Sequence, residues 1–404
     1  MKQGFLHELL HTDNDLLASW PSLKELGTEQ EPQAHGTEER LATVDWSFVN
    51  RKQAHPVESI HPYPAKFIGD IPRALLDSLS KPPGTVVFDP FCGSGTTLVE
   101  AQRKGIPSIG IDLNPIACLI SRVKTAPIPV GLGNVSLRVA NAARANRNPA
   151  RWAIPNVDHW FKEEVQEAVA SLIDSLKSIP ADATYDALRL AISSILVRIS
   201  NQESDTRYAA ISKPVNKNDV FDQFLLACQK LERALMARDW DLPEARVVEA
   251  DTLKVGEDAV GRKVGLIITS PPYPNAYEYW LYHKYRMWWL GFDPLAVKEK
   301  EIGARAHFYK REHHTEAHFW DQMRQTFKLI DRVLVPSGFV CFVIGRSKIH
   351  GRIIDNAYIL QTVASERGMR VVSRFERVIS AGRKSFNLSH ANIKTETVLV
   401  LQKD

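Results

Sequence analysis

A glycine turn and two following acids combine residue types that suit a ligand site. In Asp89–Gly95 an aspartate and a proline precede Gly93 and Gly95. Glycines let the backbone approach a ligand closely, and a carboxylate here repels a pyrophosphate but attracts an ammonium group. Asp112, 17 residues beyond Gly95, is placed to accept hydrogen bonds from ribose hydroxyls. The turn therefore favours a nucleoside joined to an amino acid, which is S-adenosylmethionine, over a dinucleotide or a ligand-free turn.

The elements that must position these residues alternate between strands and helices. Seven β-rich runs are predicted as strands: 85–88, 108–111, 246–250, 264–268, 338–344, 371–375 and 398–401. Polar clusters stand at the ends of four of them: Asp89–Gly95, Asp112, Asp251 and Ser270–Tyr273. Ligands bind at the carboxyl ends of the strands of an open parallel sheet, so these clusters are expected to converge on one crevice.

A run of helical patterns interrupts this alternation. Apolar residues recur at helical spacing three times between about residues 155 and 238, which predicts a helical insertion over 126–244. Within it, the polar break Asn201–Tyr208 follows a helix. Two interpretations stay open: a loop that reaches DNA, or a solvated turn between helices.

Five stretches, taken in this order, resemble the amino-methylating DNA methyltransferases, bacterial enzymes that act on cytosine N4 or adenine N6. They are His61–Phe67, Asp89–Thr97, Ser270–Tyr273, Phe339–Ile349 and Ser385–Asn387. The resemblance implies an α/β class I methyltransferase (Rossmann-like) fold with a seven-stranded, mostly parallel sheet. It implies a catalytic domain of residues 51–125 and 245–404, interrupted by the helical insertion 126–244 as a candidate DNA-recognition region. Residues 1–50 are expected to form an acidic arm.

The resemblance also assigns roles to individual residues. The cofactor S-adenosylmethionine would be bound by Lys66, Phe67, Asp89, Phe91, Gly93, Gly95, Thr96, Asp112 and Asp251. Among these, Asp112 would hold the ribose and Asp251 the adenine amino group. The catalytic tetrapeptide would be Ser270, Pro271, Pro272 and Tyr273.

The tetrapeptide suits chemistry on an exocyclic amine. The lone pair of such an amine is delocalised into the base, which makes the nitrogen a poor nucleophile. A Ser270 hydroxyl and a Pro271 carbonyl that accept its two hydrogens would free the lone pair, and the prolines would fix the geometry. Tyr273 would stack on the extruded base. Serine at the first position favours cytosine N4; adenine N6 and an RNA base amine are the alternatives.

Composition and charge agree with a nucleic-acid enzyme of the cytoplasm. The net charge is +4, but residues 1–50 hold three basic and nine acidic residues, whereas 301–396 hold sixteen basic and nine acidic ones. A basic body indicates either double-stranded DNA as partner or a solvated surface. No apolar run is long enough for a membrane span or a signal peptide, and the four separated cysteines suit a reducing compartment. We expect no metal, and a separately encoded restriction endonuclease is a further candidate partner.

Overall fold

The computed structural model describes residues 36–49, 54–64, 67–205, 207–274, 277–308, 314–378 and 395–404. Most of the acidic segment 1–50, together with Lys66 and Ser385–Asn387, lies outside the described residues. Among the residues that are described, no helix is both long and apolar enough to cross a membrane.

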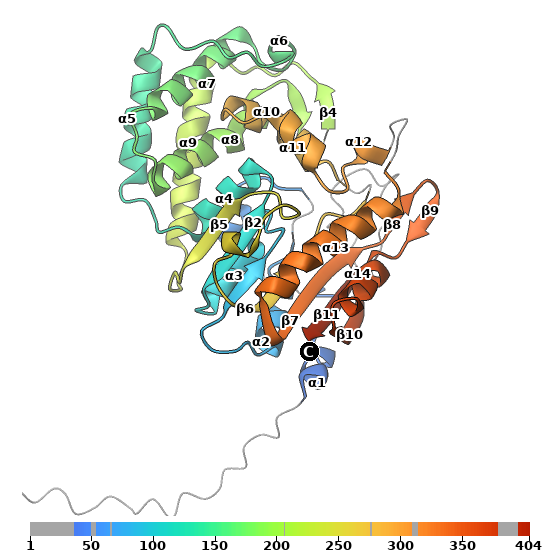
Figure 1. Cartoon of the computed structure of the whole chain (residues 1–404). Helices are drawn as coiled ribbons and strands as arrows, with labels where there is room; N and C mark the ends of the chain where they lie inside the picture. The colour runs from blue at the N-terminus through green and yellow to red at the C-terminus, as the bar shows by residue number, and fades with distance from the viewer. Residues whose placement is uncertain are drawn as a thin grey trace, which may run out of the picture.

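A seven-stranded sheet of order β10-β11-β7-β6-β1-β2-β5 forms the centre of the molecule (Figure 1). The strands are β1 (Val86–Asp89), β2 (Ser108–Asp112), β5 (Ala245–Glu249), β6 (Val264–Thr269), β7 (Leu334–Gly345), β10 (Met369–Val378) and β11 (Thr395–Lys403). The adjacent strands β5, β2, β1, β6 and β7 pair in parallel, and β11 runs antiparallel to both β7 and β10. The predicted fold class is confirmed, and all seven predicted runs are strands of this sheet.

Alternate residues of the central strands enter two apolar layers. Val86 and Phe88 pack into one layer with α13 and α14, whereas Val87 packs into the other with α1, α2 and α3. These helices are α1 (Thr37–Ala42), α2 (Asp70–Ser78), α3 (Thr96–Arg103), α13 (Glu316–Val333) and α14 (Asn356–Ser365). Because helices cover both faces, the central strands β1 and β6 are buried along their whole length, whereas the edge strand β5 is only partly buried.

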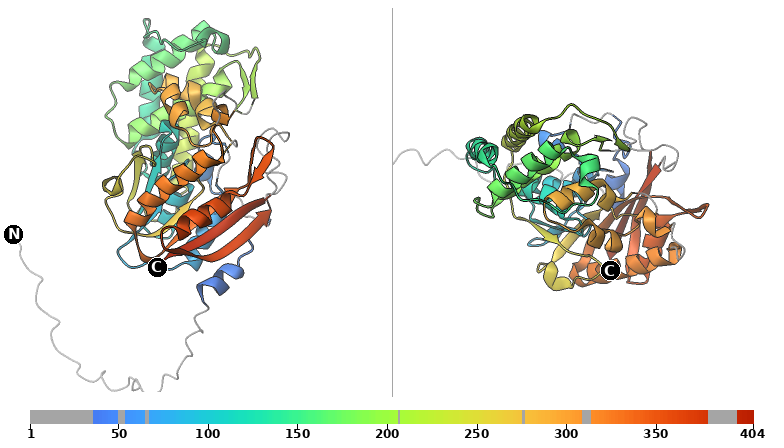
Figure 2. Two further views of the ribbon diagram at one scale, coloured as in Figure 1. Left: turned by 45° about the vertical axis from the view of Figure 1, so that its right-hand side comes forward. Right: turned by 90° about the horizontal axis from the view of Figure 1, so that it is seen from above.

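The segment between β2 and β5 is mostly helical and gathers at one end of the sheet (Figure 2). Its elements are α4 (Pro115–Thr125), α5 (Leu132–Ala145), α6 (Val157–Trp160), α7 (Glu163–Leu176), α8 (Ala183–Ile199), β3 (Gln202–Ser204), β4 (Arg207–Ala210) and α9 (Lys217–Met236). The three predicted helical patterns correspond to α7, α8 and α9. The polar break predicted as a loop or turn instead contains the two-stranded β3–β4 hairpin.

The segments after β6 and β7 complete the structure. Helices α10 (Tyr279–Trp289), α11 (Pro294–Lys300) and α12 (Arg305–Phe308) follow β6, and the hairpin of β8 (Ser347–Ile349) and β9 (Arg352–Ile354) follows β7. Short 3-10 turns lie at η1 (Pro56–Ser59) and η2 (Glu257–Ala259). Buried side chains of α10 pack in the same apolar cluster as those of α7, α8 and α9. The inserted helices and the helix after the tetrapeptide therefore share one core.

Candidate functional site

The glycine turn at the carboxyl end of β1 is held by three polar side chains. The Asp112 carboxylate accepts a hydrogen bond from the Gly93 amide at 2.8 Å, and the Ser121 hydroxyl donates to the Gly93 carbonyl at 2.7 Å. The buried Lys124 ammonium donates to the Ser94 carbonyl at 2.8 Å. Side chains from β2 and α4 therefore fix the turn before any ligand binds.

Gly95 and Thr96 begin α3 directly after this turn. Gly95 has a φ of +76°, and a Cβ added there would lie 3.0 Å from the Ser121 Cα. Both the left-handed backbone and the close approach of α4 exclude a side chain. Thr96 is buried as the first helical residue. The fold itself therefore requires a glycine at position 95, independently of any ligand in the turn.

Asp89 connects the glycine turn to the tetrapeptide loop. Its buried carboxylate accepts hydrogen bonds from the Thr269 hydroxyl at 2.6 Å and from the Phe91 amide at 3.1 Å. Burial raises the pKa of Asp89 to about 6, although these bonds act in the opposite direction. Thr269 is the last residue of β6 and precedes Ser270. The hydrogen bond between Asp89 and Thr269 therefore joins the end of β1 to the residue that directly precedes the candidate catalytic serine.

The chain that follows β5 is hydrogen-bonded to the end of β2. The Ala250 amide donates to the Asp112 carbonyl at 2.9 Å, which places Asp251 next to the end of β2. Burial raises the pKa of the Asp112 carboxyl to about 6. The Thr252 hydroxyl donates to the Pro90 carbonyl at 2.5 Å and joins the Asp251 loop to the glycine turn. The structure therefore brings the four predicted clusters to one edge of the sheet.

The tetrapeptide Ser270–Tyr273 forms the first part of the loop after β6. Pro271 is buried, and the other three residues are half-buried. A second loop packs closely against it, since a Cβ on Gly303 would lie 2.5 Å from the Tyr273 carbonyl oxygen. Burial raises the pKa of Tyr273 well above its ordinary value, so the ring stays a neutral aromatic surface.

Two aromatic rings and one acid complete the surroundings of the site. The rings of Tyr63 and Tyr279 stack with centroids 5.7 Å apart, and a Cβ on Gly93 would lie 3.3 Å from the Tyr63 hydroxyl. The buried Glu301 carboxylate accepts hydrogen bonds from the amides of Tyr279 and Trp280, both at 2.7 Å. Burial raises the pKa of Glu301 to about 8. Sequence reasoning assigned no role to Tyr63 or Glu301; Tyr63 lies within the His61–Phe67 stretch, whereas no motif marks Glu301.

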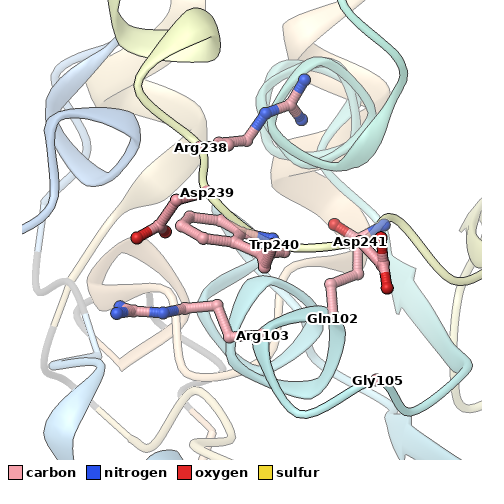
Figure 3. Close-up of a pocket in the computed structure, with 7 residues that line it drawn as sticks. All are labelled: Gln102, Arg103, Gly105, Arg238, Asp239, Trp240 and Asp241. Carbon is pink, nitrogen blue, oxygen red and sulfur yellow. The ribbon is translucent and has the colours of Figure 1, made fainter.

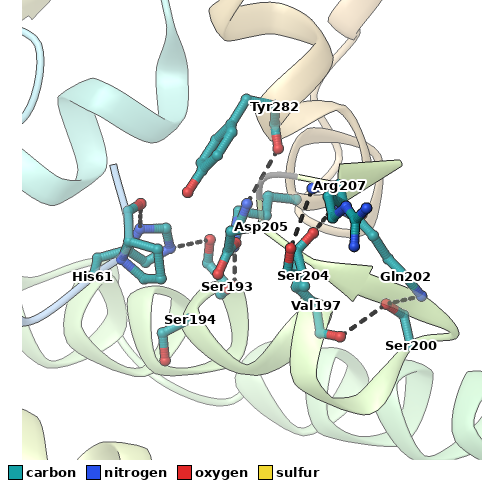
Figure 4. A network of polar contacts seen from close by, with 12 residues as sticks. His61, Ser193, Ser194, Val197, Ser200, Gln202, Ser204, Asp205, Arg207 and Tyr282 are labelled. Atoms are coloured by element: carbon teal, nitrogen blue, oxygen red, sulfur yellow. Dashed lines mark hydrogen bonds and ion pairs between the residues drawn. The ribbon is translucent and has the colours of Figure 1, made fainter. Parts of the chain in front are cut away.

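A buried polar network joins the inserted helices to this site (Figure 4). The His61 Nδ1–H donates to the Pro62 carbonyl at 2.7 Å, and Nε2 accepts from the Ser193 hydroxyl of α8 at 2.9 Å. Burial and the charge of Arg286 hold the pKa of His61 well below its ordinary value, which fixes this neutral form. The buried Arg286 of α10 donates to the Ser193 carbonyl at 3.1 Å and pairs with Asp205 of the β3–β4 turn. The insertion is therefore locked against the helix that follows the tetrapeptide.

A surface pocket of about 490 Å³ lies away from the glycine turn and the tetrapeptide (Figure 3). Its lining residues are Gln102, Arg103, Gly105, Arg238, Asp239, Trp240 and Asp241. Helix α3 begins at the glycine turn and ends at Arg103, so this pocket lies at the opposite end of the helix from the predicted site. Two arginines and two aspartates offset each other there, and the pocket holds none of the predicted site residues.

Cys92 is a packing residue within the glycine turn. It is buried, and a Cβ added at Gly110 of β2 would lie 2.8 Å from its sulfur. Burial raises the pKa of the thiol well above its ordinary value, so the nucleophilic thiolate is disfavoured. This environment argues against covalent attack by Cys92.

Three further residues, Phe67, Phe91 and Lys66, were predicted to bind the cofactor. Phe67 and Phe91 are partly buried against the two apolar layers of the sheet, and Lys66 lies outside the described residues. Within the described part of the chain, no three His, Cys, Asp or Glu side chains are grouped so that they could hold a metal ion. His318, in the first turn of α13, accepts a hydrogen bond from the Thr315 amide at 3.0 Å and so caps that helix.

Comparisons with solved structures give only remote similarity. TrmN from Thermus thermophilus matches over 87% of this chain and 52% of its own, at 13% identity and a TM-score of 0.34. The rRNA methyltransferase AviRa from Streptomyces viridochromogenes matches over 90% and 94%, at 13% identity and a TM-score of 0.32. The fold assignment above therefore depends on the strand order and pairing of this chain itself.

Sequence comparisons are more informative. A family model described as DNA methylase matches residues 12–122. The type II methyltransferase M.MvaI of Kocuria varians is 25% identical over 252 residues, which are 57% of this chain and 56% of that protein. M.BsoBI of Geobacillus stearothermophilus is 23% identical over 290 residues, 62% of this chain and 57% of that protein. The chain thus spans little more than half the length of these relatives. The DNA methylase model and the type II relatives support the resemblance of this chain to the amino-methylating DNA methyltransferases.

Proposed function

We propose that the protein transfers a methyl group from S-adenosylmethionine, the cofactor of its family, to the N4 amine of a cytosine in double-stranded DNA. One observation carries the proposal. Ser270–Tyr273 leaves β6 directly beside Asp89 and the fixed glycine turn, with Thr269 and Asp89 only 2.6 Å apart. A base amine at the tetrapeptide would therefore lie next to a ligand in the turn.

The residues at this edge of the sheet fit the cofactor. Asp89 is buried and Asp112 is partly buried, and burial raises the pKa of each to about 6 although each carboxylate accepts two hydrogen bonds from the chain. The ammonium and the ribose hydroxyls of S-adenosylmethionine would supply donors to such carboxylates. We assign the amino-acid end to Asp89, Phe91, Gly93, Gly95 and Thr96, with Lys66 and Phe67 nearby, the ribose to Asp112 and the adenine amine to Asp251.

The bound cofactor supplies an activated methyl group, and the chain prepares the amine that receives it. The Ser270 hydroxyl and the Pro271 carbonyl accept the two amine hydrogens, which draws the nitrogen lone pair out of conjugation with the ring. Pro272 holds this geometry, and Tyr273 offers the extruded base a stacking surface. The buried thiol of Cys92 takes no part, so no covalent bond forms between enzyme and base.

The organisation around this site suggests how DNA is held. We propose residues 51–125 and 245–404 as the catalytic domain and 126–244 as a DNA-recognition region. The supporting observation is that buried Arg286, seven residues into α10, pairs with Asp205 in the inserted β3–β4 hairpin. We further propose that the enzyme works in the cytoplasm, alone or beside a separately encoded restriction endonuclease.

Analysis of the methylated nucleoside tests this function. Duplex DNA incubated with the protein and radiolabelled cofactor is digested to nucleosides, with a tRNA and rRNA mixture as the competing substrate. N4-methylcytosine supports the proposal. N6-methyladenine would assign the enzyme to the other branch of its family, and label incorporated only into RNA would contradict DNA as the substrate.

Cofactor affinity is expected to rise between pH 5 and pH 7. A carboxyl with a pKa of about 6 is mostly protonated at pH 5, and only its charged form is a strong acceptor for the ammonium at Asp89 and for the ribose hydroxyls at Asp112. Protonation of either acid weakens binding by up to about tenfold at pH 5, so the combined loss reaches at most about 100-fold. Isothermal titration calorimetry measures this, and proton release on binding near pH 6 provides an independent check.

The stability of the cofactor-free protein has the opposite pH dependence. Both carboxyls have pKa values near 6 in the folded chain but about 4 when unfolded, so the folded state binds more protons between these values. Their contribution to stability is therefore present below about pH 4 and is lost as the pH rises to 6.

Cofactor affinity that is constant from pH 5 to pH 7 would contradict the assignment of these two acids.

A further inference from the structure

The β8–β9 hairpin is a basic projection at the edge of the sheet that holds the candidate site (Figures 1 and 2). Strands β6 and β7 are parallel neighbours, with Thr269 opposite Phe342. β7 ends three residues later at Gly345, and the hairpin follows at once. Because parallel strands present their carboxyl ends on the same edge, the hairpin leaves the sheet beside the tetrapeptide loop.

The hairpin has a tight turn and is anchored by hydrogen bonds at its base. His350 and Gly351 have φ values of +46° and +85° and form a two-residue turn between the paired Ile349 and Arg352. Positive φ at both central residues is the signature of a type I′ turn, which matches the twist of paired strands. At its base, the buried Asn356 side chain donates to the Gly345 carbonyl and contacts the Ser347 hydroxyl, both at 2.7 Å.

The two faces of the hairpin differ in character. Ser347, Ile349 and Ile354 are buried, and the two isoleucines belong to the apolar layer beneath α13 and α14. The opposite face carries Lys348 and its cross-strand partner Ile353, which is 72% exposed, whereas Arg352 is the partner of Ile349 and is exposed beside the turn. The buried side chains of the hairpin pack into the core, and both Lys348 and Arg352 are exposed to solvent.

The charge of this segment favours a polyanion. Residues 346–354 contain two arginines, a lysine and a histidine, and no acid. The nearest following acid, Asp355, is paired with Arg374 at 2.8 Å and accepts the Tyr358 amide at the start of α14. Phosphates attract such cations, and the deoxyribose of the backbone offers an apolar surface to a side chain such as Ile353.

We propose that the β8–β9 hairpin binds the sugar–phosphate backbone of duplex DNA beside the target base, with Lys348 and Arg352 each contacting a phosphate. This inference rests on the proposed function. It gives the catalytic domain a DNA contact of its own, on the other side of the tetrapeptide loop from the inserted helices.

The salt dependence of DNA binding tests this contact. The affinity of a fluorescent 30-base-pair duplex of mixed sequence is measured across a salt series for the full chain and for the Lys348→Ala/Arg352→Ala double variant. Each lost phosphate contact lowers the slope of log K against log salt by about 0.9, so the double variant should lose about 1.8. Its affinity at low salt should fall at least tenfold, while cofactor affinity and thermal unfolding stay unchanged.

A matched control separates a specific contact from general charge. Lys263 is an exposed lysine at the amino end of β6, on the opposite edge of the sheet. Lys263→Ala should leave the slope unchanged. An unaltered slope in the double variant, or an equal loss per charge in Lys263→Ala, would overturn the proposal. The wild-type protein is assayed for methylated DNA in the same experiment: methylation with an unaltered slope refutes only the hairpin contact, whereas absence of methylation refutes the proposed function.

Discussion

Replacing Ser270 with alanine is expected to lower the turnover number by about 10²–10³-fold while cofactor affinity stays close to that of the wild type. Removal of one preorganised hydrogen-bonding group from a site of developing charge has an effect of this size. In the proposed mechanism the serine hydroxyl acts on the amine of the base, whereas the cofactor is assigned to the glycine turn and the acids that follow β2 and β5. The change should therefore appear in single-turnover methylation rates and not in calorimetric titration with the cofactor.

Cys92→Ala is the matched control for this experiment. Cys92 lies in the glycine turn, loses a comparably small group and is fully enclosed, so any general disturbance of the site should affect both variants. We expect Cys92→Ala to retain substantial activity. Equal losses in the two variants would show that packing, and not the serine hydroxyl, controls the rate. A stable enzyme–DNA adduct that forms through Cys92 would overturn the direct mechanism.

The sheet could be predicted from the sequence because its signals are local. Four of the five parallel strands are short β-rich runs with a polar cluster near the carboxyl end, and parallel packing brings those ends together. The hydrogen bonds of Asp112 with Gly93 and of Thr252 with Pro90 join these strand ends to one another. Helices α7, α8 and α9 were predicted for the same reason, since their apolar residues recur at helical spacing.

The parts that the sequence did not predict depend on tertiary contacts. The buried face of α5 consists of small residues for the most part, Ser136, Ala140 and Ala143 among them, so its hydrophobic pattern is weak. The three-residue strands of the β3–β4 hairpin are too short for a periodic signal. Glu301 acquires its place by capping α10 from a different segment of the chain, and no local motif marks such a contact.

The His61 network has a consequence for the role of the insertion. His61 precedes the Pro62–Tyr63 segment beside the glycine turn, and it bonds to Ser193 in the inserted α8. Arg286 joins the same serine to α10 and to the inserted hairpin. Burial keeps His61 and His283 neutral, so Arg286 and Asp205 carry the charge in this network. An insertion fixed in this way can present DNA to the tetrapeptide with a defined geometry, which a flexibly attached domain could not.

Asp112→Ala is expected to weaken cofactor binding by about 10–150-fold, which corresponds to the loss of a hydrogen bond to a charged group worth about 1.5–3 kcal/mol. The carboxylate also holds the Gly93 amide at 2.8 Å, so its removal loosens the turn in addition to removing the proposed ribose contact. Asp112→Asn keeps an acceptor for that amide and should recover only part of the affinity. Glu244→Gln, at the exposed amino end of β5, is the control acid and should bind the cofactor normally. Calorimetric titration at pH 7.5 separates these outcomes, with thermal unfolding measured in parallel. Wild-type affinity in Asp112→Ala would contradict the assignment of the cofactor to this edge of the sheet, because no other described carboxylate joins the end of β2 to the glycine turn.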